Sequence, residues 1–197
     1  MQTDIILDLN EISQEEGQGL VELAKKSIKY YLQTGKIPKL EDIPFEIWKK
    51  KGATFVTLER KDTGSLRGCI GSIIPFRALY EDVISNAIAA ATKDPRFTPV
   101  SIEELPYLKT KVSILSYPVP LEYIDYQDLL NKIKPFEDGL ILKLGNYQGT
   151  FLPDVWEDLP DKEQFLAHLC LKAGLQPDCI IKYHPEIFVY KTKVFSD

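Results

Sequence analysis

Apolar residues recur at helical spacing in four stretches of the chain. The longest covers residues 13–34, where an apolar stripe repeats about every four residues: Leu20, Ala24, Ile28 and Leu32. This spacing predicts an amphipathic helix. Ser13 and Glu16 fit a capping box at its start, and Gly35 fits a left-handed stop at its end. Further helices are predicted over residues 75–93, 125–134 and 160–173.

Strands are indicated where β-branched and aromatic residues dominate short segments. Residues 53–59 and 65–74 flank the turn-forming run Lys61-Asp62-Thr63-Gly64, which predicts an antiparallel hairpin. A second hairpin is predicted over residues 139–152, and single strands over 109–116 and 187–195. Hairpins mixed with irregularly spaced helices predict an α+β fold, with mostly antiparallel sheets flanked by helices. No stretch has linker composition, so one compact unit is expected across residues 1–197.

Charge and hydropathy exclude several classes of protein. The formal net charge is −5, and a weakly acidic chain has no overall attraction for nucleic acid. The basic run Lys49-Lys50-Lys51 is more typical of a solvated loop. No apolar run is long enough to span a membrane, and acids occupy the N-terminal region where a secretory signal needs basic residues. These features predict a cytoplasmic protein.

The cysteines form neither a disulfide framework nor a metal-binding pattern. There are three, Cys69, Cys170 and Cys179, and their spacing matches no zinc or iron–sulfur motif. No metal site is therefore predicted, and the sequence leaves open whether the protein binds a cofactor. Pairing of Cys170 with Cys179 is an alternative for an oxidising or heat-adapted cell.

The segment Leu66-Arg67-Gly68-Cys69-Ile70-Gly71 is the most informative candidate for chemistry. Side chains alternate across a strand, so Arg67 and Cys69 are expected on one face, with Leu66 and Ile70 on the core face. A guanidinium beside a thiol favours the nucleophilic thiolate, which makes Cys69 and Arg67 the catalytic candidates. Gly68 and Gly71 would let a ligand or another backbone come close. Alternatively, Cys69 is a small buried apolar residue and Arg67 a structural ion-pair partner.

Two further loops hold candidate ligand-binding residues. Asp94 and Arg96 carry opposite charges on a loop stiffened by two prolines, Pro95 and Pro99. They are interpreted either as ligand anchors or as a structural clamp in which Asp94 pairs with Arg96 or Arg67. Asp154 follows a predicted strand end, where it is a candidate general base or a cap for the next turn.

Taken in order, several segments resemble the AMMECR domain family, also called AmmeMemoRadiSam system protein A. The resemblance rests on LRGCIG at residues 66–71, DPRF at 94–97, VSILS at 112–116, GTFLP at 149–153 and FLAHLCLKAGL at 165–175. It covers most of the chain, from about Ser13 to Phe188. The family commonly has Gln where this chain has Asp154, so a carboxamide role does not carry over to that position.

The resemblance implies a two-lobed fold in which LRGCIG lines a cleft between the lobes, with both termini in the larger lobe and the smaller lobe central. It also implies a shared pathway with Memo-type and radical-SAM proteins. Three hypotheses follow: a cleft that binds a small ligand or performs Cys-dependent chemistry, a non-catalytic module that binds those partners, and a housekeeping role related to nucleic acid. The residues favour the first and leave open whether it is catalytic.

Overall fold

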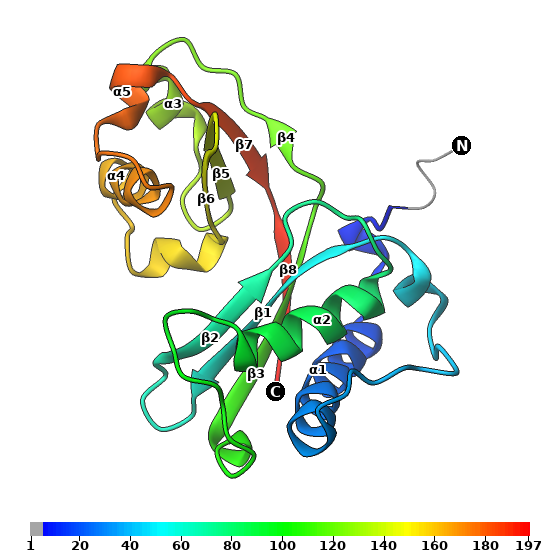
Figure 1. The fold of residues 1–197 in the computed structure, drawn as a ribbon. Coiled ribbons are helices and arrows are strands. Elements are labelled where there is room, and N and C mark those ends of the chain that lie inside the picture. The colour runs from blue at the N-terminus through cyan, green and yellow to red at the C-terminus, as the bar shows by residue number, and fades with distance from the viewer. Residues whose placement is uncertain (1–5) are drawn as a thin grey trace. The chain divides into compact units, whose positions relative to one another are not determined.

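The computed structural model describes residues 6–197, which form two compact units (Figure 1). Unit 1 contains the described residues up to Tyr117 together with Lys193–Asp197, and unit 2 contains Pro118–Thr192. Each unit has one four-stranded sheet and its own hydrophobic core. The prediction of an α+β fold with antiparallel sheets is confirmed. No linker composition marks the two points at which the chain passes from one unit to the other, so the sequence did not indicate this division.

In unit 1 the sheet has the strand order β2-β1-β3-β8, and β1 is antiparallel to both β2 and β3. Helices α1 and α2 lie on one face of it (Figure 1). The elements are α1 (Gln14–Thr34), β1 (Ala53–Arg60), β2 (Leu66–Gly71), α2 (Leu79–Thr92), β3 (Leu108–Leu115) and β8 (Thr192–Ser196). Three 3-10 helices accompany them: η2 (Leu9–Glu11), η3 (Glu46–Lys49) and η4 (Leu105–Tyr107).

Strand parity explains why the helices cover one face of this sheet. Val56 and Leu58 of β1 are fully buried against apolar residues of α1 and α2. The alternate positions form the opposite side, which we call the Cys69 face. It carries Phe55, Thr57 and Glu59 of β1, Cys69 of β2, and Lys111 and Ser113 of β3.

The predicted ends of α1 are confirmed, whereas α2 begins later than predicted. Ser13 and Glu16 make the capping box, and Gly35 has a left-handed backbone with φ of 72°. Helix α2 starts at Leu79 rather than at Pro75, because Ala78 is still extended and bridges to Lys51. Local capping chemistry is readable from sequence, but this bridge depends on a residue far away in the chain.

In unit 2 the sheet has the strand order β4-β7-β5-β6, and the paired strands are antiparallel. Its core includes Trp156, whose ring stacks on Phe165 with centroids 3.6 Å apart. The elements are β4 (Val119–Pro120), α3 (Tyr126–Lys132), β5 (Gly139–Leu144), β6 (Tyr147–Phe151), η5 (Pro153–Glu157), α4 (Lys162–Lys172), α5 (Cys179–Tyr183) and β7 (Glu186–Tyr190).

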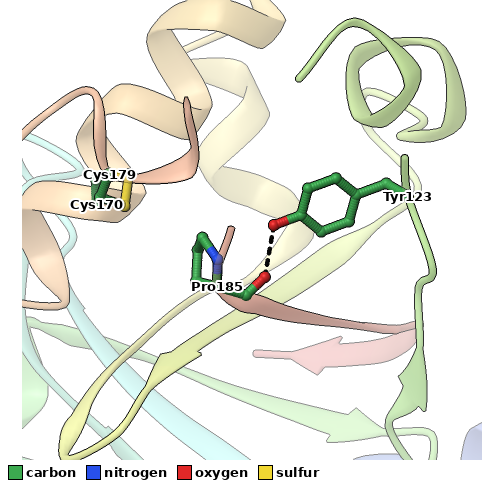
Figure 2. Close-up of a disulfide and its surroundings, with 4 residues drawn as sticks. All are labelled: Tyr123, Cys170, Cys179 and Pro185. Carbon is green, nitrogen blue, oxygen red and sulfur yellow. Dashed lines mark hydrogen bonds between the residues drawn. A yellow bond between two sulfur atoms is a disulfide. The ribbon is translucent and has the colours of Figure 1, made fainter. Parts of the chain in front are cut away.

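A disulfide joins two helices of unit 2. Cys170 in α4 is bonded to Cys179, the first residue of α5, and both are fully buried (Figure 2). Beyond α5, the Tyr123 hydroxyl donates to the Pro185 carbonyl at 2.5 Å (Figure 2). Burial raises the pKa of Tyr123 to about 12, so this hydroxyl stays a donor at neutral pH. Of the two alternatives for these cysteines, the structure has the paired one.

The predicted closing strand over residues 187–195 is wrong as a single strand. Residues 186–190 form β7 in the sheet of unit 2, and residues 192–196 form β8 in the sheet of unit 1. Both halves are rich in β-formers, so strand propensity alone does not reveal that the chain changes sheets at Lys191.

Candidate functional site

Cys69 lies on an edge strand with its thiol beside a hydroxyl group. It stands opposite Thr57 in the β1–β2 pair, and its Sγ is 3.2 Å from Thr57 Oγ1. The Cys69 residue is half-buried, whereas Thr57 is only 6% exposed. The other two cysteines form the disulfide, so Cys69 carries the thiol of this chain.

Asp94 binds the outer edge of β2 at Cys69. An edge strand presents N–H groups that have no partner strand, and the Cys69 N–H donates to Asp94 Oδ2 at 2.9 Å. Asp94 is 5% exposed and follows α2 directly. Its carboxylate also accepts two hydrogen bonds from the Arg96 guanidinium, at 3.0 and 2.8 Å. The Arg96 guanidinium, helped by the Cys69 and Arg96 backbone N–H groups, lowers the pKa of Asp94 to about 2 despite its burial.

This pKa makes unit 1 sensitive to acid. Asp94 titrates near 3.9 in an unfolded chain and at about 2 when folded, so folding favours its ionised form. The contribution is present in full above about pH 4–5 and is lost as the pH falls toward 2. Because Arg96 is half-exposed, we expect about 1–2 kcal/mol. Urea unfolding between pH 6 and pH 2.5 should show a flatter pH dependence for Asp94→Asn than for the wild type. The exposed Asp42→Asn is the control, and equal slopes for all three proteins would contradict this assignment.

Arg67 lies at an irregularity in the pairing of β2 with β1. The β1–β2 register shifts after Leu58, so Arg67 is an extra residue in β2, a β-bulge. Its guanidinium donates to both carboxylate oxygens of Glu104, at 2.7 and 3.2 Å, and to the Thr98 carbonyl at 2.8 Å. These contacts make Arg67 a structural ion-pair partner, which is one of its two interpretations, and a role for Arg67 beside the Cys69 thiol stays a prediction. The bulge also moves Leu66 out of the core, and it is 38% exposed.

The two glycines of the segment serve packing within unit 1. A Cβ on Gly68 would lie 2.1 Å from the carbonyl oxygen of Ala90 in α2. A Cβ on Gly71 would lie 2.2 Å from the ring of Phe55. The expected close approach of another backbone is thus seen at Gly68, where it is the backbone of α2, whereas an aromatic ring comes close to Gly71. A ligand-binding role for the two glycines stays a prediction.

Arg96 is a further cation that interacts with Cys69. The hydrogen bonds that its guanidinium donates to Asp94 chiefly raise the pKa of Arg96, and its charge interaction with Cys69 adds to this effect. Its side chain is half-exposed. One of the two interpretations of this loop required an ion pair between Asp94 and Arg96, and that ion pair is present. A hydrogen bond from the Cys69 N–H joins it to β2.

Known sequences and structures match the chain over almost its full length. The AMMECR1 family model covers residues 21–195. The chain belongs to the AMMECR1 family. A protein of Methanothermobacter thermautotrophicus is 42% identical over 181 residues, which are 91% of this chain and 92% of that protein. The crystal structure of an uncharacterised protein from Pyrococcus horikoshii has a TM-score of 0.88 at 40% identity, and the match covers 94% of this chain and 93% of that one.

The remaining candidates of this AMMECR1 chain are Asp154, which belongs to unit 2, and the basic run at residues 49–51. Asp154 is exposed in the first turn of η5 in unit 2. In the basic run, Lys49 pairs with Glu46 and Lys50 with Glu11. Within residues 6–197, no group of three or more metal-ligating side chains is arranged to hold a metal ion, and no helix is long and apolar enough to cross a membrane.

Sequence reasoning missed the side chains that neighbouring strands place around Cys69. Thr57 faces Cys69 across the β1–β2 pair, and Lys111 faces Thr57 across the β1–β3 pair. Lys111 Nζ donates to Glu59 Oε1 at 2.7 Å. The alternation within each strand was readable, but the facing positions require the register, which the sequence does not specify.

Proposed function

We propose that the Cys69 face of this AMMECR1 protein is a small-ligand site in which the Cys69 thiol is the reacting group and Arg96 is its charged neighbour. The supporting observation is the position of Cys69 between Thr57 Oγ1 on one side and the Asp94–Arg96 clamp on the other. A hydroxyl donor and a nearby cation both favour a thiolate over a thiol. The thiolate is the form that reacts with electrophiles.

A second hydroxyl on the same face supports a ligand rather than a purely structural thiol. Ser113 of β3 lies opposite Phe55 and is 3% exposed. In the part of the chain that the structure describes, no hydrogen bond involves its hydroxyl group. The Phe55 ring covers Gly71 of β2, on the side of β1 away from Ser113. A polar group of a ligand would give the Ser113 hydroxyl a hydrogen-bond partner.

Alkylation tests this function directly. The disulfide occupies the other cysteines, so iodoacetamide should add one group, at Cys69, and intact mass should show one adduct. In Arg96→Gln, Asp94 loses its partner and the thiolate loses a cation, so we expect about three- to tenfold slower alkylation at pH 7. The exposed Arg60→Gln should react like the wild type.

Two results would contradict the proposal. One is a folded protein in which Cys69 stays unmodified while the urea-unfolded chain reacts at the normal rate of a cysteine. The other is an Arg96→Gln variant whose rate between pH 6 and pH 9 follows the wild-type curve. Peptide mapping would confirm that the adduct is on Cys69.

A further inference from the structure

A row of three polar side chains crosses the unit 1 sheet at Cys69. Cys69 on β2 stands opposite Thr57 on β1, and Thr57 stands opposite Lys111 on β3. Directly opposed residues of antiparallel strands point to the same face, with Cβ atoms roughly 5 Å apart. Thr57 therefore lies between the thiol and the Lys111 side chain.

The far end of this row is an ion pair with limited exposure. Lys111 Nζ is 2.7 Å from Glu59 Oε1, and the two side chains are only 20% and 22% exposed. Charges with this degree of burial are less screened by salt and water than surface charges. Their effect on a group two strands away is correspondingly larger.

We propose that the Lys111–Glu59 pair and the Thr57 hydroxyl set the ionisation of Cys69, which makes Thr57, Lys111 and Glu59 positioning residues of the site. Lys111 favours the thiolate, Glu59 opposes it, and the Thr57 hydroxyl donates a hydrogen bond to the ionised sulfur. This inference rests on the proposed function, because the ionisation of Cys69 matters when the thiolate is the reacting form.

Three ion pairs supply charges near Cys69 in unit 1. They are Arg67 with Glu104, Asp94 with Arg96 on the segment after α2, and Glu59 on β1 with Lys111 on β3. The sign of a removed charge decides the direction in which the thiol pKa moves.

Two variants should consequently shift Cys69 in opposite directions. Lys111→Met leaves Glu59 uncompensated and should move the pH midpoint of iodoacetamide alkylation upward by about 0.5–1 unit. Glu59→Gln removes a negative charge and should move the midpoint downward by a similar amount. Thr57→Val should move it upward, and the Lys111→Met/Glu59→Gln double variant should return close to the wild type. Lys143→Met in unit 2 is the control and should leave the midpoint unchanged.

Opposite signs separate electrostatics from structural damage. In each reaction the thiolate sulfur bonds to the methylene carbon of iodoacetamide and iodide leaves, so the rate follows the thiolate fraction. If the two variants merely loosened the sheet, each would expose Cys69, and the pH midpoint of alkylation would move in the same direction in both. Equal shifts, or none, in Lys111→Met and Glu59→Gln would overturn the inference while leaving the Arg96 result intact. An unreactive Cys69 in the wild type would instead contradict the proposed function and this inference together.

Discussion

Replacement of Asp82 by alanine is expected to lower the free energy of unfolding of unit 1 by about 3–5 kcal/mol. Asp82 lies on α2 and is fully buried. Its carboxylate accepts five hydrogen bonds, which come from the Thr54 N–H and hydroxyl, the Ser72 hydroxyl, the Arg77 Nε and the Asn86 amide. Alanine would leave the Arg77 cation without its carboxylate and a buried N–H of β1 without an acceptor.

One tryptophan in each unit makes this effect measurable by unit. Trp48 belongs to the core of unit 1 and Trp156 to that of unit 2. With 5-fluorotryptophan, fluorine NMR during a urea titration should show the Trp48 signal moving to lower urea in Asp82→Ala. The neighbouring exposed Glu81→Gln should change the free energy of unfolding by no more than about 0.5 kcal/mol. A Trp48 transition at the wild-type urea concentration in Asp82→Ala would show that the network contributes little.

This buried network illustrates which parts of the fold the sequence predicts and which it does not. The hairpin around residues 61–64 and the ends of α1 were predicted correctly, because turn chemistry and helix caps act over a few residues. Asp82, by contrast, reads as an ordinary polar position in a helix. Its partners Thr54 and Ser72 become visible only when β1, β2 and α2 are brought together.

The candidate site was predicted in part, for the same reason. Cys69 was identified as the thiol to examine, and the Asp94–Arg96 pair was among the interpretations considered. The assignment of Leu66 to the core face assumed an unbroken alternation along residues 66–71. A β-bulge breaks that alternation, and bulges depend on how two strands pair rather than on the composition of one.

Arg67 and Arg96 differ in how far their charges are available to a ligand at Cys69. Arg67 is held in a bidentate ion pair with Glu104 and is only 12% exposed. Its charge is therefore neutralised by Glu104, and this ion pair joins β2 to the segment before η4. Arg96 has one carboxylate partner and a half-exposed guanidinium, which leaves it more accessible to an incoming ligand. Any thiolate chemistry at Cys69 should accordingly depend on Arg96 rather than on Arg67.

Gly68→Ala is expected to destabilise unit 1 by about 3 kcal/mol or more. The new Cβ would stand 2.1 Å from the Ala90 carbonyl oxygen and 3.1 Å from its carbonyl carbon. The Cβ is fixed in place by the strand backbone and the atoms that it meets belong to the helix backbone, so no side-chain rotation relieves the overlap. Relief requires β2 and α2 to move apart, which would open the core around Val56 and Ala87.

Gly71→Ala provides a matched comparison on the same strand. Its Cβ would overlap almost as closely, at 2.2 Å, but with the Phe55 ring rather than with backbone. A ring on the Cys69 face can turn about its side-chain bonds, so the loss should be smaller, about 1–2 kcal/mol. Urea unfolding of both variants measures the difference, and a larger loss in Gly71→Ala than in Gly68→Ala would contradict the packing argument.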